Sequence, residues 1–236
     1  MNEIKQKRNI IITGTSRGIG NQLAKFYCNN NYNVFGISRT ESKINNENYT
    51  HTSIDLSNHK EILEYFKNYK KKIKYLYALI NNAGTLTSMN SLLLPKDSVD
   101  NMIDINIKAN FFMSREAAKI MMPKKEGRIV NIGSMASTLK PNGDSIYAMT
   151  KSAIKTLATV LSKEYAPYGI TSNTVDITYI ETTLSKKIDS KAIEKIISCL
   201  PIPRSANFLD ITNVIDFYLS EDSSYITGQS IALGGL

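Results

Sequence analysis

The sequence has no tryptophan, and among its 236 residues only two are cysteine and two are histidine. Cys28 and Cys199 lie far apart without C-x-x-C spacing, so we expect reduced, packed thiols. His51 and His59 have no second ligand at helical spacing and no nucleophile beside them in the sequence. This scarcity disfavours metal-dependent hydrolysis and Ser-His-Asp catalysis, and we predict no bound metal.

Long hydrophobic runs are also missing. No apolar run approaches the roughly 20 residues that a membrane span requires, and the first eight residues are too polar to begin a signal sequence. We therefore expect a cytoplasmic protein without a membrane partner. The length suits one α/β domain, no repeat or low-complexity linker interrupts it, and we expect residues 1–236 to form a single domain.

Positive charge is in excess, with 29 Lys and Arg against 21 Asp and Glu, a formal net charge of +8. Clustered cations can bind nucleic-acid phosphates. The densest basic run lacks the aromatic and glycine interleaving of single-strand binders, so we interpret it as a solvated helix end and expect no nucleic-acid partner. A positive surface would also attract an anionic cofactor or an acidic carrier protein. The run consists of Lys67, Lys70, Lys71, Lys72 and Lys74.

A glycine-rich stretch, TGTSRGIG over residues 13–20, follows the apolar run 9–12 and opens an amphipathic helix. Gly14, Gly18 and Gly20 remove the Cβ atoms that would keep a phosphate from the backbone and the helix from the strand. The free N–H groups of the helix start then face an anion. The spacing is G-x-x-x-G-x-G rather than G-x-G-x-x-G, and a tight turn without a ligand is the alternative reading.

Apolar runs and helical stripes alternate along the chain. This alternation predicts an α/β fold, a doubly wound seven-stranded parallel sheet of the Rossmann type, with its ligand crevice at the carboxyl ends of the strands. Asp97 or Ser98 is expected to cap the long helix that carries Val99, Ile103, Ile107 and Phe111 and stops at Pro123. We expect strands at 9–12, 34–38, 52–55, 75–80, 128–132, 171–176 and 229–233, and later helices at 145–166, 181–198 and 209–219.

The end of the second expected strand carries Ser38 and Arg39, and Arg17 lies inside the glycine stretch. In dinucleotide-binding folds a carboxylate at this strand end bonds the adenosine ribose, whereas a basic residue accommodates a 2′-phosphate. Two cations without a carboxylate favour NADP(H) over NAD(H). The alternative is that both arginines are solvated loop residues.

Two polar features follow the fourth expected strand. Asn81 and Asn82 can bond backbone across neighbouring strands, and Gly84 permits a turn of positive φ. Asn106 lies in the middle of the long helix, where asparagine lowers helix propensity. It therefore either faces solvent or serves the site.

Tyr147 and Lys151 are four residues apart and share one face of a helix. An ammonium about 4 to 5 Å away at an effective dielectric near 20 favours a phenolate by roughly 3 to 4 kcal/mol, or about 2 to 3 pKa units. This would place the tyrosine pKa near neutrality, where a general acid or base works best. Ser134, at the end of the fifth strand, could hold a carbonyl oxygen beside the phenol. On spacing alone, such a pair is more often a surface pair than a catalytic one.

Together the TGTSRGIG stretch, the NNAG of residues 81–84, Asn106, Ser134 and the Tyr147–Lys151 pair resemble the short-chain dehydrogenase/reductase family of the single-domain Rossmann type, in order and spacing. The resemblance implies that Tyr147 protonates the carbonyl and that Lys151 lowers its pKa and binds the nicotinamide ribose. It further implies that Ser134 orients the substrate and Asn106 holds a water of a proton relay. It assigns NADP(H) binding to Gly14, Ser16, Arg17, Gly18, Ile19, Gly20, Ser38, Arg39, Asp55, Leu56, Asn82, Ala83, Gly84, Tyr147, Lys151, Ile180 and Thr182.

Within the family the sequence is most similar to 3-oxoacyl-[acyl-carrier-protein] reductases, through EGRIVNIGS, YGITSN and the ending YITGQSIALGG. It departs from them in two places. Ile177 and Thr178 replace the family's Pro-Gly, Asp176 precedes them, and Tyr168 stands where an arginine is usual. Asp176 could bond cofactor or substrate, or cap its own turn.

The resemblance implies an NADPH-dependent reductase of a ketone, with a 3-oxoacyl thioester as one candidate substrate. A sugar or another small ketone of secondary or surface-polymer biosynthesis is the alternative substrate, and a non-catalytic NADP-sensing module is the alternative function. It also implies a homodimer or homotetramer, for which small residues on the two long helices could form the interface or merely cover the sheet. These residues are Ala109, Ala117, Ala118, Ala153 and Ala158.

Overall fold

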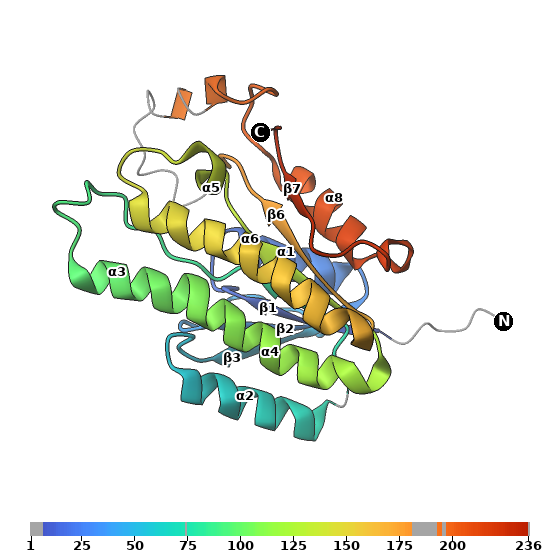
Figure 1. Cartoon of the computed structure of the whole chain (residues 1–236). Helices are drawn as coiled ribbons and strands as arrows, with labels where there is room; N and C mark the ends of the chain where they lie inside the picture. Colours follow the sequence, from blue (N-terminus) through green and yellow to red (C-terminus); the bar gives the residue numbers. More distant parts are fainter. Residues whose placement is uncertain (1–6, 74, 181–192, 195–196, 236) are drawn as a thin grey trace.

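A computed structural model describes residues 7–73, 75–180, 193–194 and 197–235 of the chain. Seven strands form one parallel sheet in the order β3-β2-β1-β4-β5-β6-β7, and helices cover both of its faces (Figure 1). The predicted doubly wound sheet is therefore confirmed. The strands are β1 (Arg8–Thr13), β2 (Tyr32–Ser38), β3 (Tyr49–Ser53), β4 (Ala78–Asn81), β5 (Gly127–Ile132), β6 (Ile170–Asp176) and β7 (Ser230–Ala232).

The helices lie in two layers. In Figure 1, α2, α4 and α6 lie in front of the sheet, and α1 and α8 pack together on its other face. The expected helix over residues 181–198 falls almost wholly outside the described residues. The helices are α1 (Gly18–Asn29), α2 (His59–Lys72), α3 (Lys96–Ile103), α4 (Ala109–Met121), α5 (Ala136–Leu139), α6 (Ser145–Tyr165) and α8 (Phe208–Leu219).

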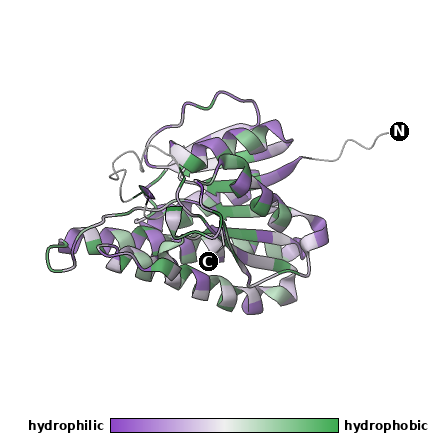
Figure 2. Cartoon of the chain, turned by 90° about the horizontal axis from the view of Figure 1, so that it is seen from above, coloured by the Kyte–Doolittle hydropathy of each residue, from purple (hydrophilic) through white to green (hydrophobic). Residues whose placement is uncertain are grey.

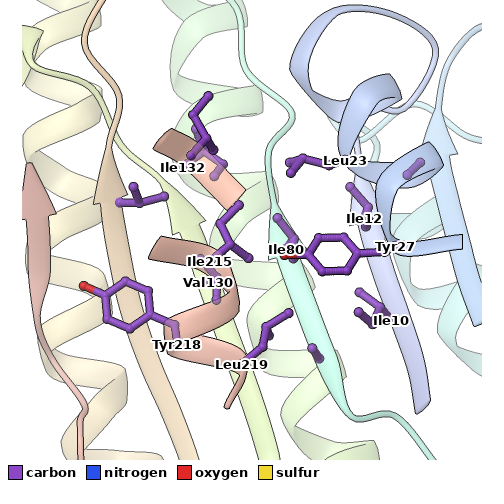
Figure 3. Packing of buried hydrophobic residues seen from close by; sticks show 14 of the residues in the cluster. Ile10, Ile12, Leu23, Tyr27, Ile80, Val130, Ile132, Ile215, Tyr218 and Leu219 are labelled. Atoms are coloured by element: carbon purple, nitrogen blue, oxygen red, sulfur yellow. The ribbon is translucent and has the colours of Figure 1, made fainter. Parts of the chain in front are cut away.

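Hydrophobic side chains from both faces of each strand form two cores. Ile10 and Ile12 of β1 pack against α1 and α8, whereas Ile11 between them packs against α2 and α4. Side chains alternate along a strand, so a strand buried on both faces needs a continuous apolar run. Figure 3 shows the first core, in which Leu23 of α1 and Ile215 of α8 approach the sheet. Figure 2 shows the mostly hydrophobic strands between helices that mix hydrophilic and hydrophobic residues.

The sheet order reverses direction between β1 and β4. The chain runs from β1 outward through β2 and β3, and then crosses to β4 on the other side of β1. Open α/β sheets bind ligands in the crevice outside the carboxyl ends of the strands at such a reversal. The loops after β1, β4 and β5 all leave the sheet at this edge.

The third strand and the start of the long helix differ from the expectation. The third strand spans Tyr49–Ser53 rather than 52–55, because its register is set by β2, where Val34 pairs with Tyr49 and Ser38 with Ser53. Neither Asp97 nor Ser98 caps the long helix, because α3 begins at Lys96 with Pro95 as N-cap and no side-chain cap bond.

The long helix also contains a π-helical turn over Asp104–Lys108, between α3 and α4. The long helix as a whole buries Met102, Asn106 and Met113, whereas Phe111 of the predicted apolar stripe is 36% exposed. Because the Asn106 side chain points inward to polar partners, the apolar stripe that was expected to face the core is directed toward solvent. A π turn inside an α-helix commonly marks a functional position.

The basic run and Cys28 lie where they were expected, whereas Cys199 is not the packed thiol that was expected. Lys70, Lys71 and Lys72 form the last turn of α2, where cations complement the helix dipole, and Lys74 lies outside the described residues. Both thiols are free, with Cys28 buried and Cys199 exposed. Over the described ranges, no helix combines the length and apolarity needed to cross a membrane.

Candidate active site

The glycine stretch makes a tight turn from β1 into α1 against the end of β4. A Cβ on Gly20 would lie 2.3 Å from both the Gly14 carbonyl oxygen and the Asn82 Nδ2. Gly18 has φ +61°, and no heavy atom lies within 4 Å of its Cβ position. Close packing therefore requires glycine at Gly20, and a left-handed backbone beside open space requires it at Gly18.

The start of α1 is free to receive an anion. Its N-cap, Arg17, has an extended backbone and no side-chain capping bond. The side chain of Arg17 is exposed, as is that of Arg39 at the end of β2, and neither forms an ion pair with any residue that the structure describes. Uncapped N–H groups and two available guanidinium groups at one edge of the sheet fit a phosphate-bearing ligand.

The NNAG segment fastens the end of β4 to the end of β1. The Thr13 hydroxyl accepts hydrogen bonds from the backbone N–H groups of Asn82 and Ala83 at 3.0 and 2.9 Å. The Asn82 side chain donates to the Thr13 carbonyl at 2.8 Å. The neighbouring Asn81 donates to Asn131 of β5 at 3.0 Å. The amides therefore tie neighbouring strands together, as the sequence predicted.

The remaining expected cofactor residues lie around this edge. The Ser38 hydroxyl is buried and donates to the Thr40 carbonyl at 2.8 Å. The Asp55 carboxylate accepts hydrogen bonds from the Ser57 N–H and hydroxyl at 3.0 and 2.9 Å. Leu56 belongs to the core that faces α2. Ser16, Ile19 and Ile180 are partly exposed, and Thr182 lies outside the described residues.

Asn106 is buried at the π turn and is fully engaged. Its Nδ2 donates to the Thr85 carbonyl and to the Thr150 hydroxyl at 2.9 and 3.0 Å, and its Oδ1 accepts from the Thr85 N–H at 2.9 Å. It thereby joins the segment after β4 to α6. A Cβ on Gly84 would lie 3.4 Å from Asn106 Oδ1 and 3.6 Å from Lys151 Nζ. Of the two possibilities open at Asn106, solvent exposure is excluded.

Tyr147 and Lys151 face the end of β5 from α6. Lys151 is 5% exposed, and its Nζ donates to the Ile132 carbonyl at 2.8 Å. The same Nζ lies 5.7 Å from the centroid of the Tyr147 ring. The Tyr147 hydroxyl has a side-chain hydrogen bond with Ser134. The structure therefore brings Ser134, Tyr147, Lys151 and Asn106 to one place.

The direction of the tyrosine pKa differs from the expectation of near neutrality. Burial raises the pKa of Tyr147 above its usual value, and the Ser134 hydrogen bond, which lowers it, does not compensate. Burial also lowers the pKa of Lys151 to about 8, while the charge of Asp176 opposes that decrease. The ammonium field favours the phenolate, but the loss of water around the buried groups has the larger effect on the Tyr147 pKa. Tyr147 is therefore a protonated phenol at neutral pH.

Asp176, the last residue of β6, neither caps its own turn nor points to solvent. One oxygen accepts from the backbone N–H of Ser134 at 3.1 Å, and the other accepts from the Ser230 hydroxyl at 2.8 Å. The ammonium of Lys155, one turn beyond Lys151 on α6, lies 2.6 Å from the second oxygen. The carboxylate thus connects β5, β7 and α6 directly behind Ser134.

Comparison with known proteins decides the family. The family model for short chain dehydrogenases matches residues 8–193. The chain belongs to the short-chain dehydrogenase family. It is thus an NAD(P)-dependent oxidoreductase acting on CH-OH or C=O groups, and the resemblance found in the sequence is confirmed.

Two kinds of relatives bear on this short-chain dehydrogenase. The 3-oxoacyl-[acyl-carrier-protein] reductase FabG of Rickettsia felis is 32% identical over 95% of the chain and 94% of its own length. FabG of Buchnera aphidicola is 33% identical over 98% of the chain and 97% of its own length. The solved structure of ElxO with NADP bound has a TM-score of 0.88 and 31% identity, and the match covers 96% of this chain and 97% of that one.

Tyr49 and Thr15 also lie at this short-chain dehydrogenase site, although no sequence motif pointed to their contact. The Tyr49 hydroxyl donates to Thr15 at 2.8 Å and lies 2.9 Å from His51, whose other ring nitrogen is 3.4 Å from Ser38. His51 therefore does have a hydroxyl neighbour. Gly36 was the available signal, because a glycine inside a strand often marks a close approach, and its Cβ would lie 2.2 Å from the Tyr49 hydroxyl.

Among the residues that the structure describes, no group of three or more His, Cys, Asp or Glu side chains could hold a metal ion.

Proposed function

We propose that this short-chain dehydrogenase reduces a ketone to an alcohol with NADPH, with Ser134, Tyr147, Lys151 and Asn106 as its site residues. The observation that carries the proposal is the half-buried Tyr147 hydroxyl bonded to Ser134, with the Lys151 ammonium nitrogen 5.7 Å from the centroid of its ring. These groups lie at the same edge of the sheet as the glycine stretch. A proton donor beside a dinucleotide cradle is the arrangement that carbonyl reduction requires.

The residues of the cradle fit NADP(H). The open space at Gly18 and the uncapped start of α1 would receive the pyrophosphate, and Arg39, supported by Arg17, would bind the 2′-phosphate. ElxO, a relative of the same fold, has NADP bound in its solved structure, and a variant of it has NADPH bound. When bound, NADPH supplies the hydride for the reduction.

The chain's own residues would hold the carbonyl oxygen and transfer the proton to it. The hydroxyls of Ser134 and Tyr147 hold the carbonyl oxygen, and the Tyr147 O–H gives its proton to that oxygen as negative charge develops there. The Lys151 ammonium then stabilises the tyrosinate, because an opposite charge favours the ionised form. Asn106 holds the Thr85 segment against α6, which keeps the wall around Lys151 in place.

A 3-oxoacyl thioester is the proposed substrate class. The FabG relatives are named as 3-oxoacyl-[acyl-carrier-protein] reductases and match the chain over nearly its whole length. The net charge of +8 would favour an acidic carrier. Tyr168 in place of the usual arginine weakens this choice, and a sugar or another small ketone is the second substrate class to test.

The test is NADPH oxidation by the purified protein with a panel of carrier-bound and free 3-oxoacyl thioesters, diketones and keto-sugars. Tyr147→Phe is expected to lower kcat at least 10³-fold, since the proton donor is lost, while the Kd for NADPH stays within about threefold. Tyr225→Phe is the matched control, because that side chain is 99% exposed. Retained turnover in Tyr147→Phe would refute the assignment. Cofactor binding without turnover of any ketone would instead favour the NADP-sensing module.

We also propose that the protein assembles as a homodimer or homotetramer through the outer faces of α4 and α6. Ala109, Ala117, Ala118 and Ala158 are buried within the subunit, so these alanines cover the sheet. The exposed apolar side chains Phe111, Met149 and Val160 of the two helices remain for a contact between subunits.

A further inference from the structure

Asp176 is a buried carboxylate at the point where this chain departs from its family's pattern. It is 1% exposed, and both of its oxygens have partners from other elements. Burying an ionised carboxylate is strongly unfavourable unless charged or polar groups compensate. Here the compensation comes from the Ser134 N–H, the Ser230 hydroxyl and the Lys155 ammonium.

The backbone at Gly133 leaves room for the Asp176 carboxylate. A Cβ on Gly133 would lie 2.0 Å from Asp176 Oδ1, so the glycine before Ser134 permits the approach. The carboxylate then holds the N–H of Ser134 at 3.1 Å. The position of the Ser134 backbone is thus fixed by a charge that comes from the neighbouring strand.

The partner of Asp176 belongs to the helix that carries the site. Tyr147, Lys151 and Lys155 lie at i, i+4 and i+8 on α6 and therefore share one face. Lys155 is 29% exposed at its side chain and lies 2.6 Å from the carboxylate. Lys151 is buried one turn away and bonds the Ile132 carbonyl rather than a carboxylate.

Over the described residues, polar and charged groups from several elements surround Lys151. Tyr147 and Lys155 share its helix, and Ser134 lies at the end of β5. Asp176 follows Val175 on β6, and Val175 pairs with Ile132, whose carbonyl accepts the hydrogen bond from Lys151. Gly84 and Asn106, which approach from the other side, carry no charge. Asp176 is the carboxylate whose field acts on Lys151.

We infer that Asp176 and Lys155 form a charge pair that positions Ser134 and sets the charge of Lys151. This inference rests on the proposed function in that Ser134 and Lys151 are taken as site residues. Asp176 favours the ammonium form of Lys151, and Lys155 limits that effect by neutralising part of the carboxylate charge. Both are positioning residues, because neither is required to touch substrate or cofactor.

Removal of the Asp176 charge and removal of the Lys155 charge should then shift the Lys151 pKa in opposite directions. Asp176→Asn keeps the shape and one acceptor oxygen but removes the negative charge, so the Lys151 pKa should fall from about 8 by roughly 0.5 to 1 unit. Lys155→Met removes a positive charge one turn away and frees the Asp176 field, so the pKa should rise by a similar amount. The double variant should lie between them.

The experiment is a pH titration of the Lys151 13Cε signal by NMR, with the signal assigned from its loss in Lys151→Met. Because it uses neither substrate nor turnover, it decides the inference even where the proposed function fails. The pH profile of NADPH-dependent reduction is the second readout. Asp176→Asn should lose about 3- to 10-fold more activity at pH 8.5 than at pH 6.5, and Lys155→Met should extend activity to higher pH.

A purely structural role would lower stability in both variants and would leave the Lys151 titration unchanged or move it in one direction. Either result would overturn the inference. If Asp176→Asn does not fold, Lys155→Met still decides, since only an upward shift agrees with the pair. Lys155→Arg serves as the conservative variant, and it should restore the wild-type titration.

Discussion

Lys151 is held in the interior by one carbonyl and the field of one carboxylate. Its side chain is 5% exposed, and burial lowers its pKa to about 8. A group shifted in this way destabilises the folded state whenever it is charged, because the unfolded chain binds the same proton more tightly. The charged form of Lys151 therefore lowers the stability of the folded protein, although the proposed reaction depends on this residue.

Lys151→Met should separate the two effects. At pH 7 we expect the free energy of unfolding to rise by roughly 1 to 3 kcal/mol, since the buried ammonium is gone, while turnover falls at least about 100-fold. Between about pH 8 and the ordinary lysine value of about 10.5, the unfolded wild type binds more protons than the folded one, so wild-type stability rises with pH. The advantage of the variant should shrink over that range.

Urea unfolding of both proteins at several pH values measures this difference. The comparison between the two proteins cancels the titration of the buried tyrosines, which they share. A variant that is less stable than wild type at pH 7, with a difference independent of pH, would show that Lys151 is not buried at a free-energy cost.

At the scale of elements, the turn between β1 and α1 depends on how closely three segments approach. Gly20 lies within α1, where replacing glycine by alanine usually stabilises a helix by about 0.5 to 1 kcal/mol. Here a Cβ would lie 2.3 Å from the Gly14 carbonyl oxygen. The helix start would have to move away from the ends of β1 and β4.

Gly20→Ala should therefore lower the free energy of unfolding by about 1 to 3 kcal/mol, the opposite of the usual sign, because overpacking outweighs helix propensity. Gly18→Ala is the matched comparison: its Cβ would meet no atom within 4 Å, but its φ of +61° is unfavourable for alanine. We expect a loss of about 1 kcal/mol there, with a clear weakening of NADPH binding. Chemical unfolding and fluorescence titration test both, and a stabilised Gly20→Ala would contradict the packing described for the turn.

The π turn at Asp104–Lys108 also depends on contacts with segments outside its own helix. Asn106 lies within it and bonds to both sides, to the segment after β4 and to α6. Such a turn widens the helix by one residue and disturbs its regular hydrogen bonds. The three hydrogen bonds of the Asn106 side chain offset that loss in the folded molecule.

At the scale of the whole molecule, both faces of the sheet leave apolar side chains exposed over the described residues. α4 and α6 present Phe111, Met149 and Val160, with Val160 45% exposed, whereas α8 on the opposite face presents Leu209 at 61%. Exposed apolar side chains are common one at a time, so only a matched substitution on each face can show which face is an interface.

Val160→Glu should convert the assembled protein to a smaller species in sedimentation velocity, because a charge would be buried in the contact between subunits. Leu209→Glu should leave the assembly unchanged. Dissociation by Leu209→Glu alone, or a monomeric wild type, would contradict assembly through α4 and α6.

The sequence by itself determined the local features of the chain. The apolar run at 9–12 fixed a strand buried on both faces, the glycine spacing fixed the turn into α1, and the four-residue interval placed Tyr147 and Lys151 on one helical face. Periodicity and short spacings are local properties, so they can be derived without the fold. They were enough to predict the seven-stranded sheet, whereas the roles of the site residues came from the resemblance to the short-chain dehydrogenase/reductase family.

Only the tertiary structure decided what surrounds those residues. The register of β2 moved the third strand, and burial raised the pKa of Tyr147 where the ammonium field alone predicted a decrease. Asp176 acquired partners on β5, β7 and α6 that lie far from it in the sequence. Burial and long-range charge pairing depend on the packing of all the elements together, and no local pattern in the sequence contains that information.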